Sequence, residues 1–160
     1  MDGRIGVIRD RLDNEGFGKT IILSYAAKFA SNFYGPFRDA VGSSKALGKT
    51  DKKTYQMDYK NSDEAIREVA MDINEGADMV MIKPALPYLD VISKVKQKFN
   101  IPILAYQVSG EFSMLKFGEK EKIIDYEKCL YESLIAIKRS GASAIFCYGA
   151  IDIAKNLKNE

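Results

Sequence analysis

The sequence contains no histidine and has only two cysteines in 160 residues. Without histidine, the chain cannot supply a Ser-His-Asp triad, a Cys-His pair or a histidine metal ligand. Cys129 and Cys147 do not form a CxxC motif, so we expect neither a disulfide framework nor a cysteine zinc site from this chain alone. Lysine, aspartate, glutamate, serine, tyrosine and arginine remain for catalysis.

The sequence also lacks an excess of one charge and a long hydrophobic run. Its 24 Lys and Arg against 22 Asp and Glu leave a net charge of +2, which gives no electrostatic reason to expect a nucleic-acid partner. No apolar run approaches the ~20 residues of a membrane span, and the charged segment MDGRIGVIRDRLDNEG has no signal-peptide core. We therefore expect a cytoplasmic protein without a membrane partner, although a start inside a longer gene would hide a leader.

The apolar residues are grouped into short runs that predict an α/β fold. At 160 residues and 46% hydrophobic, the chain suits one globular domain. The apolar runs predict buried strands at 20–23, 79–82, 101–105 and 144–146, and amphipathic patterns predict helices at 62–75, 87–99 and 126–139. A helix followed by four βα units indicates parallel strands, which fit either a four-stranded open sheet or part of a (β/α)₈ barrel.

Two glycines and one polar stretch mark the connections. Gly76 and Gly141 each follow a predicted helix and precede a predicted strand, as a glycine at the C′ position would. The stretch GSSKALGKTD, rich in Gly, Ser and Lys, is either a lid over a site or an ordinary exposed connection.

The sharpest chemical signal is Lys83, which directly follows the apolar run 79–82. The carboxyl ends of parallel strands face the site in such folds. Burial and a second ammonium both lower the pKa of a lysine, and a neutral amine forms Schiff bases with carbonyl compounds. The alternative is a lysine that extends to solvent or forms an ion pair. Taken singly, Lys28, Arg38 and the lysines of 45–53 suit structural roles better.

Taken together, several blocks resemble one enzyme family. The segments SYAAKFASNFYGPFRDAVGSS, DKKTYQMD, EGADMVMIKPALPYLD and YQVSGEFSML are similar to signature blocks of the 5-aminolevulinate dehydratase (porphobilinogen synthase) family, in the family's order. The resemblance covers nearly the whole chain. It implies a (β/α)₈ TIM-barrel fold, of which residues 1–160 are a single partial domain, the C-terminal half. It also implies that 42–53 is a lid.

The resemblance implies a reaction and a set of site residues. The family condenses two molecules of 5-aminolevulinate into porphobilinogen with loss of two waters, on the route to haem and other tetrapyrroles. Lys83 in MIKP and Lys28 in SYAAKFAS would be the catalytic lysines. Two groups would bind the substrate carboxylates: Ser109 and Tyr148 for the first substrate, and Arg38, Lys52 and Gln56 for the second.

The metals and the assembly that the resemblance implies lie largely outside this chain. Glu68 in EAIREV matches a carboxylate that holds an allosteric magnesium in many members. A catalytic zinc or other metal would be bound by the N-terminal half, and family members form homo-octamers. Plant members suggest a plastid as the alternative compartment, if a transit peptide precedes the chain.

Half a barrel would have two open strand edges and an uncovered apolar interior, which favour self-association. We therefore expect a fragment, a truncated product or one half of a split enzyme, inactive by itself. The alternatives are another Schiff-base enzyme of the class I aldolase type, and a non-catalytic half-barrel that serves as an interaction module.

Overall fold

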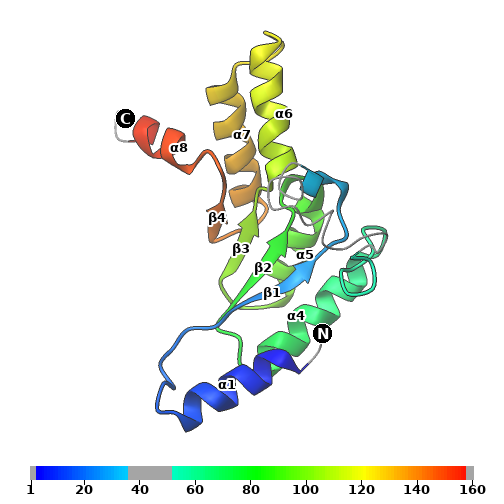
Figure 1. Ribbon diagram of the computed structural model, residues 1–160, viewed down its shortest axis with the longest axis vertical. Coiled ribbons are helices and arrows are strands. Elements are labelled where there is room, and N and C mark those ends of the chain that lie inside the picture. Colours follow the sequence, from blue (N-terminus) through cyan, green and yellow to red (C-terminus); the bar gives the residue numbers. More distant parts are fainter. Residues whose placement is uncertain (1–2, 36–51, 158–160) are drawn as a thin grey trace.

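The structure is a computed structural model that describes residues 3–35 and 52–157. Over these residues the chain alternates between helices and strands (Figure 1). In chain order, the elements are α1 (Arg4–Asn14), β1 (Leu23–Lys28), η1 (Asn32–Tyr34), α4 (Ser62–Asn74), β2 (Met79–Lys83), η2 (Leu86–Tyr88), α5 (Leu89–Lys98), β3 (Ile103–Tyr106), α6 (Ser109–Lys120), α7 (Tyr126–Arg139), β4 (Ala144–Phe146) and α8 (Ala150–Leu157).

The four strands form one parallel sheet in the order β1-β2-β3-β4, which is also their order along the chain. Helix α4 packs against β1 and β2, α5 against β3, and α7 against β4. Figure 1 shows α6 and α7 side by side, extending beyond the sheet. The predicted α/β class with parallel strands and intervening helices is therefore confirmed.

The core lies between the sheet and the helices α4 and α5. Val80 and Ile82 of β2, Val69 of α4 and Val95 of α5 are all fully buried in one hydrophobic cluster. Each such side chain stabilises the fold by roughly 1.5–3 kcal/mol relative to an exposed position. Strand β2 is buried because it lies between β1 and β3 and is covered by α4.

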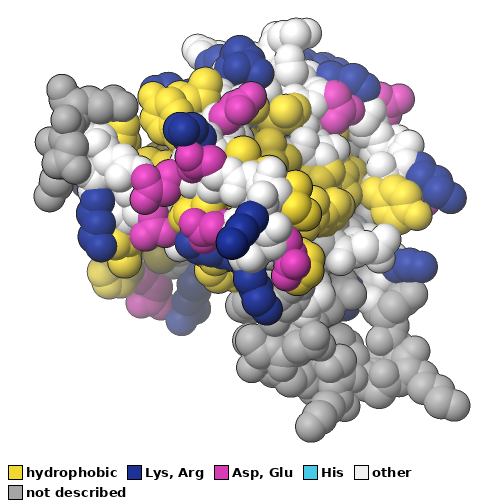
Figure 2. Space-filling view, turned by 90° about the horizontal axis from the view of Figure 1, so that it is seen from above, with side chains coloured by type: hydrophobic (Ala, Val, Ile, Leu, Met, Phe, Trp, Pro, Cys, Tyr) yellow, Lys and Arg dark blue, Asp and Glu magenta, His cyan; other side chains and the backbone are white. Residues whose placement is uncertain are grey.

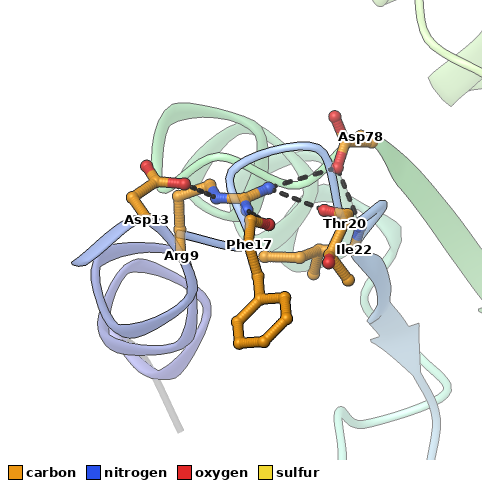
Figure 3. Close-up of polar contacts among 6 residues, drawn as sticks. All are labelled: Arg9, Asp13, Phe17, Thr20, Ile22 and Asp78. Carbon is orange, nitrogen blue, oxygen red and sulfur yellow. Dashed lines mark hydrogen bonds and ion pairs between the residues drawn. The ribbon is translucent and has the colours of Figure 1, made fainter. Parts of the chain in front are cut away.

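Helix α1 is attached to the rest of the molecule through polar contacts, and none of its residues is buried. Figure 3 shows Arg9 of α1 at the centre of these contacts: its guanidinium pairs with Asp13 and Asp78 and donates to the Thr20 carbonyl oxygen at 2.9 Å. Asp78 in turn accepts from the Ile22 N–H at 2.7 Å. These contacts hold α1 beside the amino-terminal ends of β1 and β2.

Most elements match the sequence prediction, and one strand differs. Helix α7 and strand β4 have the predicted bounds, while α4 ends one residue earlier than predicted. The prediction for the first strand is wrong, because β1 begins at residue 23, where the apolar run 20–23 ends. Strand β1 contains Ser24 and Tyr25, so its sequence is not an apolar run. Helix α6 was not predicted, and α8 is the helix of the fourth predicted βα unit, for which no bounds were given.

The helix ends follow the expected backbone chemistry. The N–H groups of Asp63 and Glu64 donate to the Asn61 side chain, which caps α4. Gly76 and Gly141 have φ angles of 99° and 123° just beyond the ends of α4 and α7, where glycine avoids the strain that a Cβ would cause. The two predicted C′ glycines are confirmed.

The sheet has two open edges, at β1 and β4, within the part of the chain that the structure describes. Large side chains near these edges are exposed: Tyr25 is 49% exposed and Phe146 is 47% exposed. Seen from above in Figure 2, basic and acidic side chains alternate around hydrophobic patches. Among the described helices, none is both long and apolar enough to cross a membrane.

Candidate functional site

Lys28 and Lys83 are neighbours at the carboxyl edge of the sheet. Each is the last residue of its strand, and the two are direct partners in the parallel register of β1 and β2. The register continues across the sheet, because Ile82 pairs with Ala105 and Tyr106 pairs with Phe146. Lys28, Lys83, Tyr106 and Phe146 therefore form one row, with two cations followed by two aromatic rings.

The position of Lys83 favours the neutral form of its amine. Burial and the nearby ammonium of Lys28 together lower the pKa of Lys83 from 10.5 to about 8. Both effects disfavour the charged form, and the larger one is desolvation. The sequence-based expectation that a second ammonium helps to neutralise one of the lysines is confirmed in direction. A useful fraction of neutral amine is present near pH 8.

Tyrosine rings surround the amine of Lys83. Its Nζ lies 3.9 Å from the ring centroid of Tyr106, 5.5 Å from that of Tyr25 and 5.7 Å from that of Tyr34. The π faces stabilise an ammonium and limit its access to water. The rings therefore oppose the lowering of the Lys83 pKa while they form an apolar wall around its nitrogen.

The predicted carboxylate-binding residues Ser109 and Tyr148 flank the aromatic end of this row. Ser109 begins α6 directly after the loop that follows β3, and it is 9% exposed. Tyr148 follows β4, its ring centroid lies 6.3 Å from that of Tyr106, and it is 45% exposed. Desolvation and a hydrogen bond with Tyr106 raise the pKa of Tyr148 to about 12, so its hydroxyl stays protonated as a donor.

A second group of predicted residues lines a cavity of about 310 Å³ beside β1. Lys28, Gln56 and Glu68 all contribute to its wall, together with Tyr25 and Asp72. Gln56 is 5% exposed, and its side-chain Oε1 has no hydrogen-bond partner among the described residues. Its backbone N–H donates to the Lys52 carbonyl oxygen at 3.0 Å, which places Lys52 one turn away. The structure thus brings one lysine and one buried amide to the same cavity.

Two predicted features lie wholly or largely outside the described residues. Arg38 is one of them, and the other is the predicted lid 42–53, of which only Lys52 and Lys53 are described.

Sequence reasoning also missed two residues of the site. Tyr34 contacts Lys83 from η1, and Glu111 supports the strand ends from α6. Tyr34 lies in the motif YGPFR and Glu111 in the motif VSGE. Neither residue directly follows a predicted strand, so a search for polar residues at strand ends does not select them.

The described part of the chain does not fit a complete transition-metal site. It holds no group of three or more His, Cys, Asp or Glu side chains placed to bind a metal ion. Cys129 and Cys147 are free cysteines, and burial raises the pKa of the Cys147 thiol, which opposes the thiolate form that binds zinc.

A parallel sheet in sequence order, with reactive side chains at its carboxyl edge, is the arrangement of the (β/α)₈ barrel enzymes. Comparison with known proteins agrees. The family described as "Delta-aminolevulinic acid dehydratase" matches residues 1–156. The chain belongs to this family.

Relatives and a solved structure show the extent of the similarity. The chain is 52% identical over 160 residues to the delta-aminolevulinic acid dehydratase of Bradyrhizobium diazoefficiens, covering all of this chain and 45% of the relative. It is 51% identical over 160 residues to the chloroplastic enzyme of Pisum sativum, covering 40% of that protein. The chain thus spans less than half the length of these relatives.

The structural comparison agrees with the sequence comparison. A crystal structure of porphobilinogen synthase from Toxoplasma gondii, in complex with the reaction product porphobilinogen, matches with a TM-score of 0.93 at 52% identity. The match covers 97% of this chain and 44% of that chain. The four βα units therefore have the fold of that part of the TIM-barrel enzyme, and the predicted fold class is confirmed.

Proposed function

We propose that this chain carries the lysine half of a porphobilinogen synthase, which condenses two molecules of 5-aminolevulinate into porphobilinogen. One observation carries the proposal: Lys28 and Lys83 are register partners, and Lys83 has a pKa lowered to about 8. A class I aldolase mechanism needs one such lysine, and a paired second lysine suits a reaction of two carbonyl substrates better.

In the proposed first step, the neutral amine of Lys83 attacks the ketone carbon of one 5-aminolevulinate. The ketone oxygen leaves as water, and a protonated imine remains on Lys83. Ser109 and the Tyr148 hydroxyl bind the carboxylate of this substrate. The lowered pKa of Lys83 supplies the free amine, and the tyrosine walls exclude water from the imine.

In the proposed second step, the other 5-aminolevulinate meets Lys28 through its ketone and forms the second imine. Its carboxylate binds Arg38, Lys52 and Gln56, with the lid 42–53 closing over it. One carbon–carbon bond and one carbon–nitrogen bond then join the substrates. Both lysines leave as free amines, so that the net loss over the whole reaction is two waters.

Reductive trapping tests the proposal. The chain is incubated with 5-aminolevulinate and cyanoborohydride, and the modified lysine is mapped by mass spectrometry. We expect an adduct on Lys83, its loss in Lys83→Ala, and no change in Lys128→Ala, which removes an exposed lysine outside the site. Labelling spread over exposed lysines would contradict the proposal. A folded chain without any adduct would favour the non-catalytic half-barrel.

We also propose that Glu68 is a carboxylate ligand of an allosteric magnesium ion, while any catalytic zinc is bound by residues outside this chain. Magnesium is held by one or two carboxylates plus waters, and the Glu68 side chain lines the same cavity as Asp72. Its carboxylate pairs with Arg67 at 3.2 Å, so the ion must compete with that guanidinium. Calorimetric titration of the chain with Mg²⁺ should show binding that Glu68→Gln removes. Equal heats from both proteins would end the idea.

The remaining expectations concern assembly and compartment. We propose a homo-oligomer, the octamer of the resemblance, in the cytoplasm, with the plastid as the alternative that the chloroplastic relatives suggest. The open edges at β1 and β4 support association with further chain. Light scattering of the purified chain should give a mass above that of one chain, and a monomer at all concentrations would contradict association.

A further inference from the structure

Glu111 is a buried carboxylate that binds two separate segments of the backbone. Its side chain lies in the first turn of α6, and the residue is 4% exposed. One oxygen, Oε2, accepts from the Val108 N–H at 2.6 Å and the Ala85 N–H at 3.4 Å. The other, Oε1, accepts from the Leu86 N–H at 2.7 Å. The carboxylate therefore joins the loop after β2 to the loop after β3.

These two loops carry the two halves of the first substrate site. Ala85 and Leu86 follow Lys83 by two and three residues, and Val108 directly precedes Ser109. The Lys83 carbonyl oxygen is itself fixed by the Phe29 N–H at 3.0 Å and the Tyr34 hydroxyl at 3.2 Å. A Cβ at Gly110 would clash with the Phe33 carbonyl, so α6 also lies directly against η1. The lysine and the serine are thus held in one rigid unit.

The Glu111 carboxylate accepts more hydrogen bonds than the capping of α6 requires. Capping α6 needs only the bond from the Val108 N–H, and a neutral acceptor would supply it at a smaller desolvation cost. The two oxygens of a carboxylate accept from several donors at once, and such charge-assisted bonds are short and strong. The bonds to Ala85 and Leu86 serve the lysine loop, not the helix.

We propose that Glu111 is a positioning residue that sets the location of Lys83 relative to Ser109, so that a ketone reaches the amine when its carboxylate is bound. This inference rests on the proposed function, since it assigns Ser109 to the carboxylate of the first substrate. Glu111→Gln is the informative variant. The glutamine keeps one acceptor oxygen but turns an NH₂ toward a backbone N–H. Hydrogen bonds at one of the two carboxylate oxygens are therefore lost, and the link between the loop after β2 and the loop after β3 loses one side.

The experiment compares two ketones on the full chain. Levulinate carries a carboxylate and butanone does not, and the rate of cyanoborohydride-trapped adduct on Lys83 is measured for both. We expect wild type to prefer levulinate. We expect Glu111→Gln to lower that preference roughly tenfold, because misplaced reactants lose rate steeply, while the butanone rate stays unchanged. Glu119→Gln, an exposed carboxylate on the same helix, is the matched control and should behave as wild type.

The outcomes separate the two proposals. An unchanged preference in folded Glu111→Gln overturns the positioning role. If that variant is unfolded by circular dichroism, Glu111→Asp replaces it; this variant keeps both oxygens on a shorter arm, and a wild-type preference there overturns the role as well.

If wild type itself shows no preference, the carboxylate site of the proposed function is wrong, and amide hydrogen exchange then decides the role of Glu111. Because Glu111→Gln loses one side of the link, exchange must accelerate in that variant at Leu86, or at Ala85 and Val108. Unchanged exchange at all three amides overturns the inference.

Discussion

The two halves of the sheet present different chemistry in the same row of residues. At the carboxyl edge, β1 and β2 end in Lys28 and Lys83, whereas β3 and β4 end in Tyr106 and Phe146. The halves also differ in burial. The middle residues of β2 are essentially inaccessible, while Ala144 and Phe146 of β4 are exposed.

This difference indicates how the site divides its work. A low-polarity surrounding and a neighbouring ammonium both favour the neutral form of a lysine. The aromatic half offers ring faces and the Tyr148 hydroxyl, which suit contact with a bound organic acid. Under the proposed function, the lysine half forms the bonds and the aromatic half holds the substrate.

The largest contrast is expected in stability. Ile82→Ala in β2 removes a fully buried side chain and should lower the free energy of unfolding by about 2–5 kcal/mol. Ile145→Ala in β4 removes a partly buried one and should cost clearly less. Urea denaturation of both variants measures the difference. Equal losses would show that β4 is as well packed in solution as β2.

The next effect concerns pH. Folding lowers the pKa of Lys83 from 10.5 to about 8, so the unfolded chain binds more protons between these values. Through this group, the free energy of unfolding rises with pH across that window. Below pH 8 the partly buried ammonium is destabilising, and Lys83→Met should be more stable than wild type there. Denaturation at pH 7 and pH 9.5 should show this advantage shrinking, whereas a constant advantage would argue against the shift.

A smaller effect tests the aromatic half. Tyr106→Leu removes the ring that lies 3.9 Å from the Lys83 amine, a contact worth roughly 0.5–2 kcal/mol to the ammonium. The pKa of Lys83 should therefore fall further. Tyr106→Phe keeps the ring, so it should leave the pKa of Lys83 unchanged while lowering that of Tyr148, which loses its hydrogen bond. Competitive labelling of lysines against pH measures Lys83 in both variants.

The smallest expected change follows from the neighbouring lysine. Lys28→Met removes an ammonium and should move the labelling midpoint of Lys83 upward, by less than burial lowers it, because burial is the larger cause. Raised salt should produce the same trend in wild type and little change in the variant. A downward movement in Lys28→Met would mean that Lys28 mainly shields Lys83 from water.

The sequence predicts those parts of the fold in which one local pattern dominates. Helix α7 has a clear amphipathic period and an Asp125 cap, and its bounds were predicted correctly. Helix α6 was missed because Gly110 and Gly118 weaken its helical pattern. Strand β1 was misplaced because polar Ser24 is buried in it through a tertiary contact, the hydrogen bond with Asp72.

The site was also predictable only in part, because some of its residues are selected by tertiary contacts and not by a local sequence pattern. Lys83 stands out because a cation directly follows an apolar strand, and Lys28 was selected by family resemblance. Glu111 accepts hydrogen bonds from two loops. One loop lies 25 or 26 residues away in sequence, and the other directly precedes α6. No periodicity reports such a contact. Its role is visible only when the backbone donors are located in three dimensions.

The pairing of Lys28 with Lys83 has a consequence for how such a site can vary. Adjacent parallel strands are held roughly 4.8 Å apart by backbone hydrogen bonds, whatever their side chains are. The separation of the two lysine backbones is therefore inherited from the peptide groups of β1 and β2. Surrounding helices and loops can diverge in sequence and retune the acidity of each amine, while the geometry of the pair is preserved without selection on any one side chain.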